Sequence, residues 1–415
     1  MIPSMSAVRF ETGQTDARPG ARLGRLVTPH GMIDTPAFVV VATQAAAKSL
    51  QPDELVALGA QAVLCNTYHL YLRPGPETVA EHGGLHRFMA WPGPIFTDSG
   101  GYQVFSLGFG LEHGIGKLVG MFPDEDPPEA RQGRRGGQPA RLNRIDDDGV
   151  TFRSHLDGST CRLTPEKSIE VQEQLGADVI LAFDEPTSPL HDAAYTRQAM
   201  ERTHRWARRC LDARRRPDQA LFGIVQGGAF QALREESAAF IGQLPFDGFA
   251  LGGSLGKSKR DMHRVLDWSV PALPAYRPRH MLGIGEPEDL IECVERGIDT
   301  FDCVAPTRLA RRGVLYTSRG KITITQARYR ADSVPIDETC SCPACRSFSR
   351  AYLRHLFVAE ELLAYTLATM HNLRFVLELM ERIRQAIESG TLARLKAEVL
   401  ADQYPTLSLE GAAHV

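Results

Sequence analysis

The chain has 415 residues, of which 43% are hydrophobic and 23% are charged, and its formal net charge is -3. These values are ordinary for a globular protein, and the length allows one large hydrophobic core or two smaller ones. A chain so close to neutral has no globally basic field, so any nucleic-acid surface must be a local patch.

The compartment is indicated by the amino terminus and by the cysteines. The first residues, MIPSMSAVRFETG, lack the basic and apolar pattern of a secretion signal, and no apolar run approaches membrane-spanning length. We therefore expect a cytoplasmic protein without a membrane anchor. Five of the eight cysteines are scattered, which favours reduced core residues, and three form a cluster near position 342.

In chain order, residues 1–36 carry short β-rich runs and Gly/Pro turns, which predict an antiparallel sheet. From residue 37 onward, short apolar runs alternate with helical patterns. We predict eight strands at 37–42, 62–64, 94–97, 179–183, 221–225, 247–251, 280–284 and 298–304.

This alternation is typical of an α/β fold of the (β/α)₈ TIM-barrel class. Polar residues such as Asn66, Asp98, Asp184 and Gln226 follow the apolar runs. In such barrels the carboxyl ends of the strands form the catalytic face, so we expect these side chains to converge there. A doubly wound open sheet is the alternative, but no Gly-rich phosphate loop follows the first strand.

The predicted domains are a sheet at 1–36, barrel strands at 37–313, a subdomain at 314–373 and helices completing the barrel at 374–415. Residues 108–148 interrupt the barrel with dense Pro, Gly and charge, and we expect a flexible loop there. Its five arginines could touch RNA, although a solvated insertion is the simpler interpretation.

A metal site is indicated by Cys340, Cys342 and Cys345, three thiols within six residues. Three thiolates and one imidazole make the closed tetrahedral shell of structural zinc, with no open position for a catalytic water. Disulfides are the alternative, but a cytoplasmic chain disfavours them. Either His371 or His355 could complete the set.

The segment from Gly297 to Gly313 carries Asp302 inside an apolar run and then Arg308, Arg311 and Arg312 in what we expect to be a cationic loop. Taken alone, it favours an ion pair that holds the loop. The expected mouth of the barrel holds three aspartates, a glutamine and the Gly252-Gly253 pair. Their hydrogen-bonding groups favour binding of a planar base with a guanine-like edge. With Asp302 as nucleophile and Asp98 as proton carrier, the expected chemistry is glycosidic bond cleavage by double displacement.

Several motifs together resemble the tRNA-guanine transglycosylases, also called queuine tRNA-ribosyltransferases, of bacterial type. These motifs are TDSGGYQVFSL (97–107), FDEPTSP (183–189), GIVQGG (223–228), FALGG (249–253), GIDTFDCVAPTRLARRG (297–313) and the CxCxxC cluster with His371. They occur in the family's order and span the chain from about residue 8 to about residue 380. The resemblance implies a (β/α)₈ barrel with an inserted zinc subdomain, and a glycosyltransferase that exchanges guanine at the wobble position (34) of tRNA.

The resemblance also implies roles for individual residues. It makes Asp302 the nucleophile on ribose C1′ and Asp98 the general acid/base. It places base recognition on Asp184, Gln226 and Gly253 and base stacking on Tyr102. Ser99, which we also expect to bind the substrate, and Asn66 fall in stretches that match the family. It assigns tRNA phosphate contacts to Arg308, Arg311 and Arg312, and structural Zn²⁺ to Cys340, Cys342, Cys345 and His371. The expected partners are tRNA with a G-U-N anticodon, a 7-deazaguanine base and a second copy in a homodimer.

Three features depart from the bacterial pattern. Pro186 replaces a cysteine, Lys257 replaces a glutamate in a turn that is one residue shorter, and the insertion at 108–148 is unusual. We expect 7-aminomethyl-7-deazaguanine (preQ1) as the incoming base, for queuosine biosynthesis. Queuine or another 7-deazaguanine is the alternative, and a non-catalytic tRNA-binding subunit is the alternative of another class.

Overall fold

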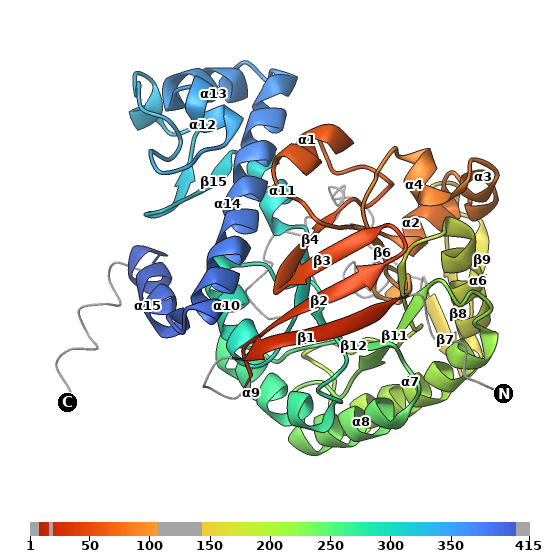
Figure 1. Cartoon of the computed structure of the whole chain (residues 1–415). Helices are drawn as coiled ribbons and strands as arrows, with labels where there is room; N and C mark the ends of the chain where they lie inside the picture. The colour runs from red at the N-terminus through yellow and green to blue at the C-terminus, as the bar shows by residue number, and fades with distance from the viewer. Residues whose placement is uncertain (1–7, 16–19, 106–142, 404–415) are drawn as a thin grey trace, which may run out of the picture. The chain divides into compact units, whose positions relative to one another are not determined.

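The computed structural model describes residues 8–15, 20–105 and 143–403 (Figure 1). The chain divides into two compact units. The first lies within Met1–Phe10, Val27–Gly31 and Cys65–His280, and the second within Glu11–Leu26, Met32–Leu64 and Met281–Val415. Among the described residues, no helix is both long enough and apolar enough to cross a membrane.

Eight strands close into a barrel whose strand order follows the chain. They are β4 (Ala37–Val41), β5 (Val63–Cys65), β6 (Ile95–Thr97), β10 (Val179–Leu181), β11 (Ala220–Val225), β12 (Gly248–Leu251), β13 (Arg279–Met281) and β14 (Thr300–Cys303). The pairs β4–β5, β6–β10, β10–β11, β11–β12 and β14–β4 are parallel. Every residue of β4 and β11 is buried, as expected for strands covered on both faces. The predicted (β/α)₈ fold is confirmed.

Helices lie between the strands: α1 (Pro52–Ala57), α2 (Thr67–Leu72), α3 (Pro76–Glu81), α4 (Gly84–Phe88), α6 (Pro165–Leu175), α7 (Ala193–Ala213), α8 (Gln231–Gln243), α9 (Lys259–Ser269), α10 (Pro287–Glu295) and α11 (Ala305–Arg311). Several begin where a side chain accepts a hydrogen bond from the first turn. Thr164 caps α6, Asp192 caps α7 and Ser258 caps α9. Such caps satisfy backbone N–H groups that have no partner within the helix.

Two three-stranded sheets lie outside the barrel. The predicted N-terminal sheet is present as β1 (Arg9–Thr15), β2 (Arg22–Thr28) and β3 (Gly31–Thr35). The second sheet pairs β7 (Asn143–Asp146), β8 (Gly149–Arg153) and β9 (Thr160–Leu163) in antiparallel register. Residues 143–146 therefore form a strand where the sequence favoured a loop, because pairing with β8 supplies backbone partners that composition does not reveal. The loop prediction for residues 108–142 lies outside the described residues.

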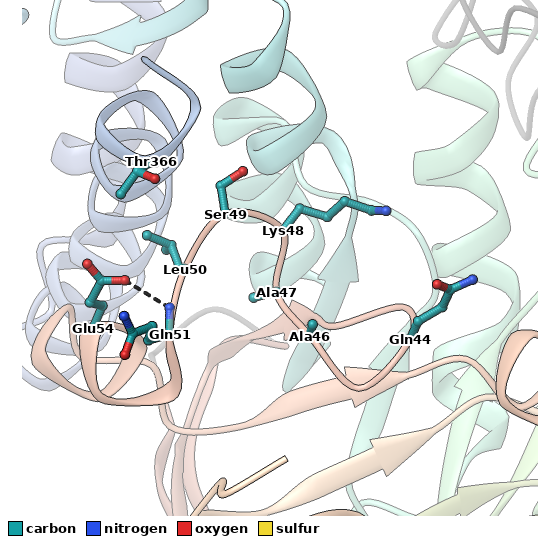
Figure 2. A pocket seen from close by; sticks show the side chains of 9 residues that line it. All are labelled: Gln44, Ala46, Ala47, Lys48, Ser49, Leu50, Gln51, Glu54 and Thr366. Carbon is teal, nitrogen blue, oxygen red and sulfur yellow. Dashed lines mark hydrogen bonds between the residues drawn. The ribbon is translucent and has the colours of Figure 1, made fainter. Parts of the chain in front are cut away.

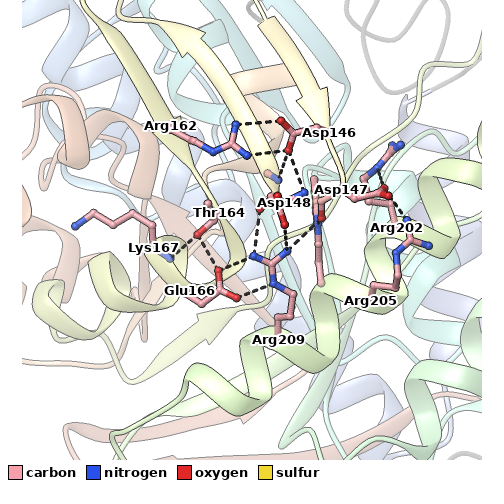
Figure 3. Close-up of polar contacts among 12 residues, drawn as sticks. Asp146, Asp147, Asp148, Arg162, Thr164, Glu166, Lys167, Arg202, Arg205 and Arg209 are labelled. Atoms are coloured by element: carbon pink, nitrogen blue, oxygen red, sulfur yellow. Dashed lines mark hydrogen bonds and ion pairs between the residues drawn. The ribbon is translucent and has the colours of Figure 1, made fainter.

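The second sheet is fastened to α6 and α7 by an ion-pair network on the β7–β8 turn (Figure 3). Arg202 and Arg205 both bind Asp147, while Arg209 binds Glu166 at 2.6 Å and the carbonyl oxygens of residues 147 and 148. Arg202 also pairs with the buried Glu185, which follows Asp184 in the chain. Most of these pairs are exposed and individually weak, but together they fix the turn on the helices.

His204 on α7 is a buried histidine of the first unit. Its Nε2 lies 3.1 Å from Ser237 Oγ on α8, and its ring stacks on Phe240. Ser237 Oγ also accepts the Gln226 N–H, and its own hydroxyl proton is available to donate to a neutral imidazole. Burial lowers the pKa of His204 to about 4.

We predict that the free energy of unfolding falls as the pH drops from about 6.5 to about 4. In this range His204 is protonated in the unfolded chain but stays neutral in the folded protein. The lowered pKa of His204 corresponds to a decrease in the free energy of unfolding on the order of 3 kcal/mol at the acid end of this pH range. His204→Asn should reduce this acid loss in urea titrations at pH 8, 6 and 4.5. The exposed His355→Asn should follow the wild type, and identical acid responses in all three proteins would contradict the assignment.

In the second unit, residues after the barrel form the hairpin β15 (Val314–Thr317) and β16 (Gly320–Thr323) and the helices α12 (Pro343–Ser347), α13 (Arg350–Val358), α14 (Leu362–Glu388) and α15 (Leu392–Gln403). Leu315, Ile324, Leu353 and Leu356 contribute to one buried apolar cluster there. Helix α14 runs unbroken across position 373, where we drew a domain boundary. The predicted domain boundaries stay predictions.

Candidate active site and metal centre

Asp98 follows β6 in the first unit and is held by three N–H donors. Its Oδ2 accepts from Asn66 Nδ2 at 2.6 Å and from Gln103 Nε2 at 2.8 Å, and its Oδ1 accepts from the Thr67 N–H at 2.7 Å. Donors arranged in this way stabilise a carboxylate in its ionised form. The side chain is half-buried, so this carboxylate is both oriented and accessible.

Gln103 is a contact that sequence reasoning missed. It lies five residues after Asp98, in the helical stretch 101–105 that begins directly after the turn. That spacing in a strand–turn–helix sequence was the available signal. Tyr102, the predicted stacking residue, is its half-buried neighbour in the same stretch.

Asp184, Gln226 and Ser99 form a buried polar cluster in the same unit. Asp184 accepts from Ser99 Oγ at 3.0 Å and from Gln226 Nε2 at 2.7 Å, and all three residues are at most 5% exposed. Gln226 Oε1 is buried without a hydrogen-bond partner in the described structure. A buried acceptor in this state is suited to a ligand that brings its own donor.

Glycines bring backbone close to this cluster. A Cβ at Gly253 would lie 2.1 Å from Gln226 Oε1, and one at Gly252 would lie 2.9 Å from Gln226 Nε2. A Cβ at Gly101 would lie 2.8 Å from the Asp184 carbonyl oxygen. Side chains at these positions would occupy the space beside the polar cluster. The structure thus brings Ser99, Asp184, Gln226 and Gly253 together.

Asp302 lies in the second unit, in the middle of β14. It is half-buried, and its Oδ1 accepts from the Gly283 N–H at 3.0 Å. This hydrogen bond from backbone orients the carboxylate, whose two oxygens can accept several hydrogen bonds. The neighbouring Cys303 is fully buried, and burial raises the pKa of its thiol to about 12, so it stays a neutral thiol beside Asp302.

The arginines after Asp302 lie on a helix and not on the cationic loop that we expected. Pro306 stands in the first turn of α11, where its fixed φ and missing N–H are tolerated, and this starts the helix. Arg308 and Arg311 are half-buried in its last turn, and Arg312 caps it. Burial and repulsion from Arg308 and Arg312 lower the pKa of Arg311. Three cations that repel each other favour an anionic partner.

The predicted metal ligands form one compact group. One ligand atom from each of Cys340, Cys342, Cys345 and His371 lies within 4.8 Å of the others. His371 Nδ1 is 3.7 Å from Cys342 Sγ and 3.3 Å from Cys345 Sγ. The competing candidate, His355, is exposed on α13 and is not part of this group.

The protonation states in this group fit a metal. His371 Nε2 lies 2.6 Å from the Tyr316 carbonyl oxygen, which only accepts, so Nε2 carries the proton and Nδ1 turns its lone pair toward the thiols. Hydrogen bonds from Cys340 and Cys345 lower the pKa of Cys342. A thiolate beside an imidazole lone pair is a ligand arrangement for a soft divalent ion.

His30, His86 and Asp178 form a second compact group, but its geometry argues against a metal. Asp178 accepts from His30 Nδ1 at 2.8 Å and His86 Nε2 at 3.1 Å. The two rings stack with centroids 3.5 Å apart and planes 16° from parallel. Two nearly parallel stacked rings cannot both direct their in-plane lone pairs at one metal ion. In this group the two histidines instead hold the Asp178 carboxylate by hydrogen bonds.

A cavity of about 480 Å³ lies in the second unit, beside the loop after β4 (Figure 2). Its lining includes Gln44, Lys48, Leu50 and, from α14, Thr366. Glu54 accepts from the Gln51 N–H at 2.8 Å and closes the loop onto α1. None of the predicted site residues lines this cavity.

Comparison with known proteins decides the family. A model of the queuine tRNA-ribosyltransferase family matches residues 16–116 and 132–405. The chain belongs to this family. It is 51% identical over 388 residues to a putative queuine tRNA-ribosyltransferase of Archaeoglobus fulgidus, covering 91% of this chain and 96% of the relative. It is 52% identical over 368 residues to the queuine tRNA-ribosyltransferase of Herpetosiphon aurantiacus, covering 88% and 86%.

A third relative, the queuine tRNA-ribosyltransferase of Symbiobacterium thermophilum, is 50% identical over 396 residues, covering 95% of this chain and 91% of the relative. The family predicted from the motifs is confirmed, and with it the enzyme class, a tRNA-guanine transglycosylase among the pentosyltransferases.

Proposed function

We propose that this protein exchanges guanine at the wobble position (34) of tRNAs with G-U-N anticodons for a 7-deazaguanine. The observation that carries the proposal is the Ser99–Asp184–Gln226–Gly253 cluster with its unpartnered Gln226 Oε1. Guanine presents N–H donors next to the O6 acceptor. Asp184 and Gln226 Oε1 supply acceptors for such an edge, and the Gly253 N–H supplies a donor. Tyr102 would stack on the base.

The chemistry is assigned to two carboxylates. Asp302 attacks ribose C1′ as the C1′–N9 bond to guanine breaks, which gives a ribosyl ester on Asp302. Asp98 gives a proton to the departing guanine and takes one from N9 of the incoming base, so its carboxyl group ends as it began. The incoming N9 then attacks C1′ and frees Asp302. The donors from Asn66, Thr67 and Gln103 stabilise Asp98 as the carboxylate between these proton transfers.

We assign contacts with the phosphates of the tRNA backbone to Arg308, Arg311 and Arg312, because guanidinium groups that repel one another favour binding of phosphate anions. We also assign Zn²⁺ to Cys340, Cys342, Cys345 and His371. With four protein ligands it would be structural, joining the 340–345 loop to α14 without taking part in the reaction. The homodimer implied by the resemblance stays a prediction.

For the incoming base we propose the aminomethyl compound preQ1, with queuine or another 7-deazaguanine as the alternative. A lysine ammonium close to a cationic base would repel it, but Lys257 is exposed, and its backbone N–H donates to Asp261. An exposed ammonium is screened by water, so its repulsion of an aminomethyl group is small. Pro186 is half-buried and offers no thiol, which leaves the choice of base to measurement.

The test is incorporation of radiolabelled guanine into a tRNA with a G-U-N anticodon, with a matched tRNA carrying adenine at position 34 as control. We expect label in the first tRNA only. Unlabelled preQ1 and queuine are then compared as competitors. A queuine preference above about tenfold, or 1.4 kcal/mol, would reverse the ranking of bases. Binding of tRNA without incorporation would instead support a non-catalytic tRNA-binding subunit.

A further inference from the structure

Arg234, on α8, is a buried arginine whose contacts link two loops of the candidate base pocket. Its side chain is 0% exposed. Nε donates to the Gly228 carbonyl at 2.7 Å, and Nη1 donates to the Val225 carbonyl at 3.0 Å. Nη2 donates to the carbonyls of Gly252 at 2.9 Å and Ser254 at 2.8 Å.

These four acceptors are backbone carbonyls, and no carboxylate is among the partners of Arg234 in the described structure. Burial lowers the pKa of the guanidinium to about 9, so the group remains a cation at neutral pH. Burying a cation without an anionic partner is unfavourable, and an apolar side chain would fill a core position at lower cost. The specific feature that the arginine adds is a planar fork that fixes several carbonyls at once.

The four carbonyls flank Gln226 and Gly253, the residues to which we assign recognition of the base. Val225 is the last residue of β11 and precedes Gln226, while Gly228 follows Gln226 in the loop after the strand. Gly252 and Ser254 lie on either side of Gly253 in the loop after β12. Because a peptide is planar and trans, turning the Gly252 carbonyl toward Arg234 turns the Gly253 N–H the opposite way. The Gly253 Cα lies next to Gln226 Oε1, since a Cβ added to it would come within 2.1 Å of that oxygen.

We propose that Arg234 is a positioning residue for base recognition, holding the Gln226 loop and the Gly253 peptide in one fixed arrangement. The proposal rests on the function proposed above. Arg234 touches neither base nor ribose in this scheme; it sets the direction of the donor and acceptors that do. Its loss should therefore weaken guanine recognition more than tRNA binding.

The first test is Arg234→Lys, which keeps the charge and loses the fork. We expect the KM for guanine to rise by at least about tenfold while the KM for tRNA stays within about twofold. Ile241→Ala is the matched control, a buried residue of the same helix that should lower Tm and leave the KM for guanine near the wild-type value. Two outcomes would show that Arg234 only stabilises the fold. One is an equal change of the KM for guanine and the KM for tRNA in Arg234→Lys, and the other is the same rise of the KM for guanine in Ile241→Ala.

A second test keeps the proposal open to refutation if Arg234→Lys does not fold. Arg234→Ala leaves space for ethylguanidinium, and low millimolar ethylguanidinium should restore the affinity for guanine whereas ethylurea should not. Rescue by both compounds, or by neither in a folded protein, would overturn the proposal. Absence of guanine incorporation by the wild type would refute the proposed function itself, and that outcome is distinct because it requires no variant.

Discussion

Asp302→Asn is expected to abolish turnover and the covalent protein–RNA adduct while tRNA binding survives. The amide keeps the shape of the side chain, and its oxygen can still accept the Gly283 N–H. An amide oxygen is a far weaker nucleophile than a carboxylate, so no ribosyl ester should form. We expect kcat to fall by at least about 10⁴-fold, which corresponds to roughly 5 kcal/mol. The measurement is a denaturing gel of protein mixed with labelled tRNA, together with guanine incorporation.

Asp299→Asn is the matched control, because it changes a carboxylate three residues earlier that we assign to stability. Asp299 is fully buried and receives two hydrogen bonds from Arg22, at 2.8 and 2.6 Å. Removing its charge breaks this buried ion pair, so Tm should fall. The adduct should still form at permissive temperature. A shifted protein–RNA band with Asp302→Asn, or its loss in folded Asp299→Asn, would refute the assignment of the nucleophile.

The barrel could be predicted from the sequence because its strands are short apolar runs followed by polar residues. Val179–Leu181 before Asp184, and Ala220–Val225 before Gln226, show this pattern directly. Burial on both faces removes the alternation that would mark an ordinary strand, so the predicted boundaries differ from the observed ones by up to three residues, the largest difference being at the end of the strand predicted at 280–284. The Cys340–Cys342–Cys345 group was predictable as a candidate metal site for a different reason, since three cysteines within six residues have the close spacing typical of metal sites.

The remaining contacts depend on partners that leave no trace in the sequence. Arg234 stands in the segment QALREES, which has the composition of a polar helix face, yet it is buried and donates to backbone carbonyls on either side of its helix in the chain. Carbonyls are present at every residue, so no residue type signals that contact. Gln103 was missed because its contact depends on how the helix leaves the turn after Asp98. The strand β7 was missed because Asn143–Asp146 is polar and gains its order from pairing with β8.

Removing one metal ligand is expected to disorder the part of the second unit around the cluster. Cys342 and Cys345 belong to the apolar cluster that also contains Leu315, Leu353 and Leu367, so loss of the metal would leave buried thiols and an imidazole without their common partner. His371→Ala should lower the metal content from about one ion per chain to about zero and lower Tm by on the order of 10 °C. The measurements are elemental analysis, which also identifies the metal, and thermal unfolding.

Cys293→Ala supplies the control, since Cys293 is a buried cysteine on α10 outside the cluster. It should lose some stability through the cavity and keep its metal. The residual activity of His371→Ala separates a structural from a catalytic metal. If the ion is structural, the folded fraction of the variant keeps its KM for guanine and its adduct formation at low temperature. If Tm is unchanged and adduct formation is lost, the metal takes part in the chemistry, and a closed shell of four protein ligands is the wrong description of the site.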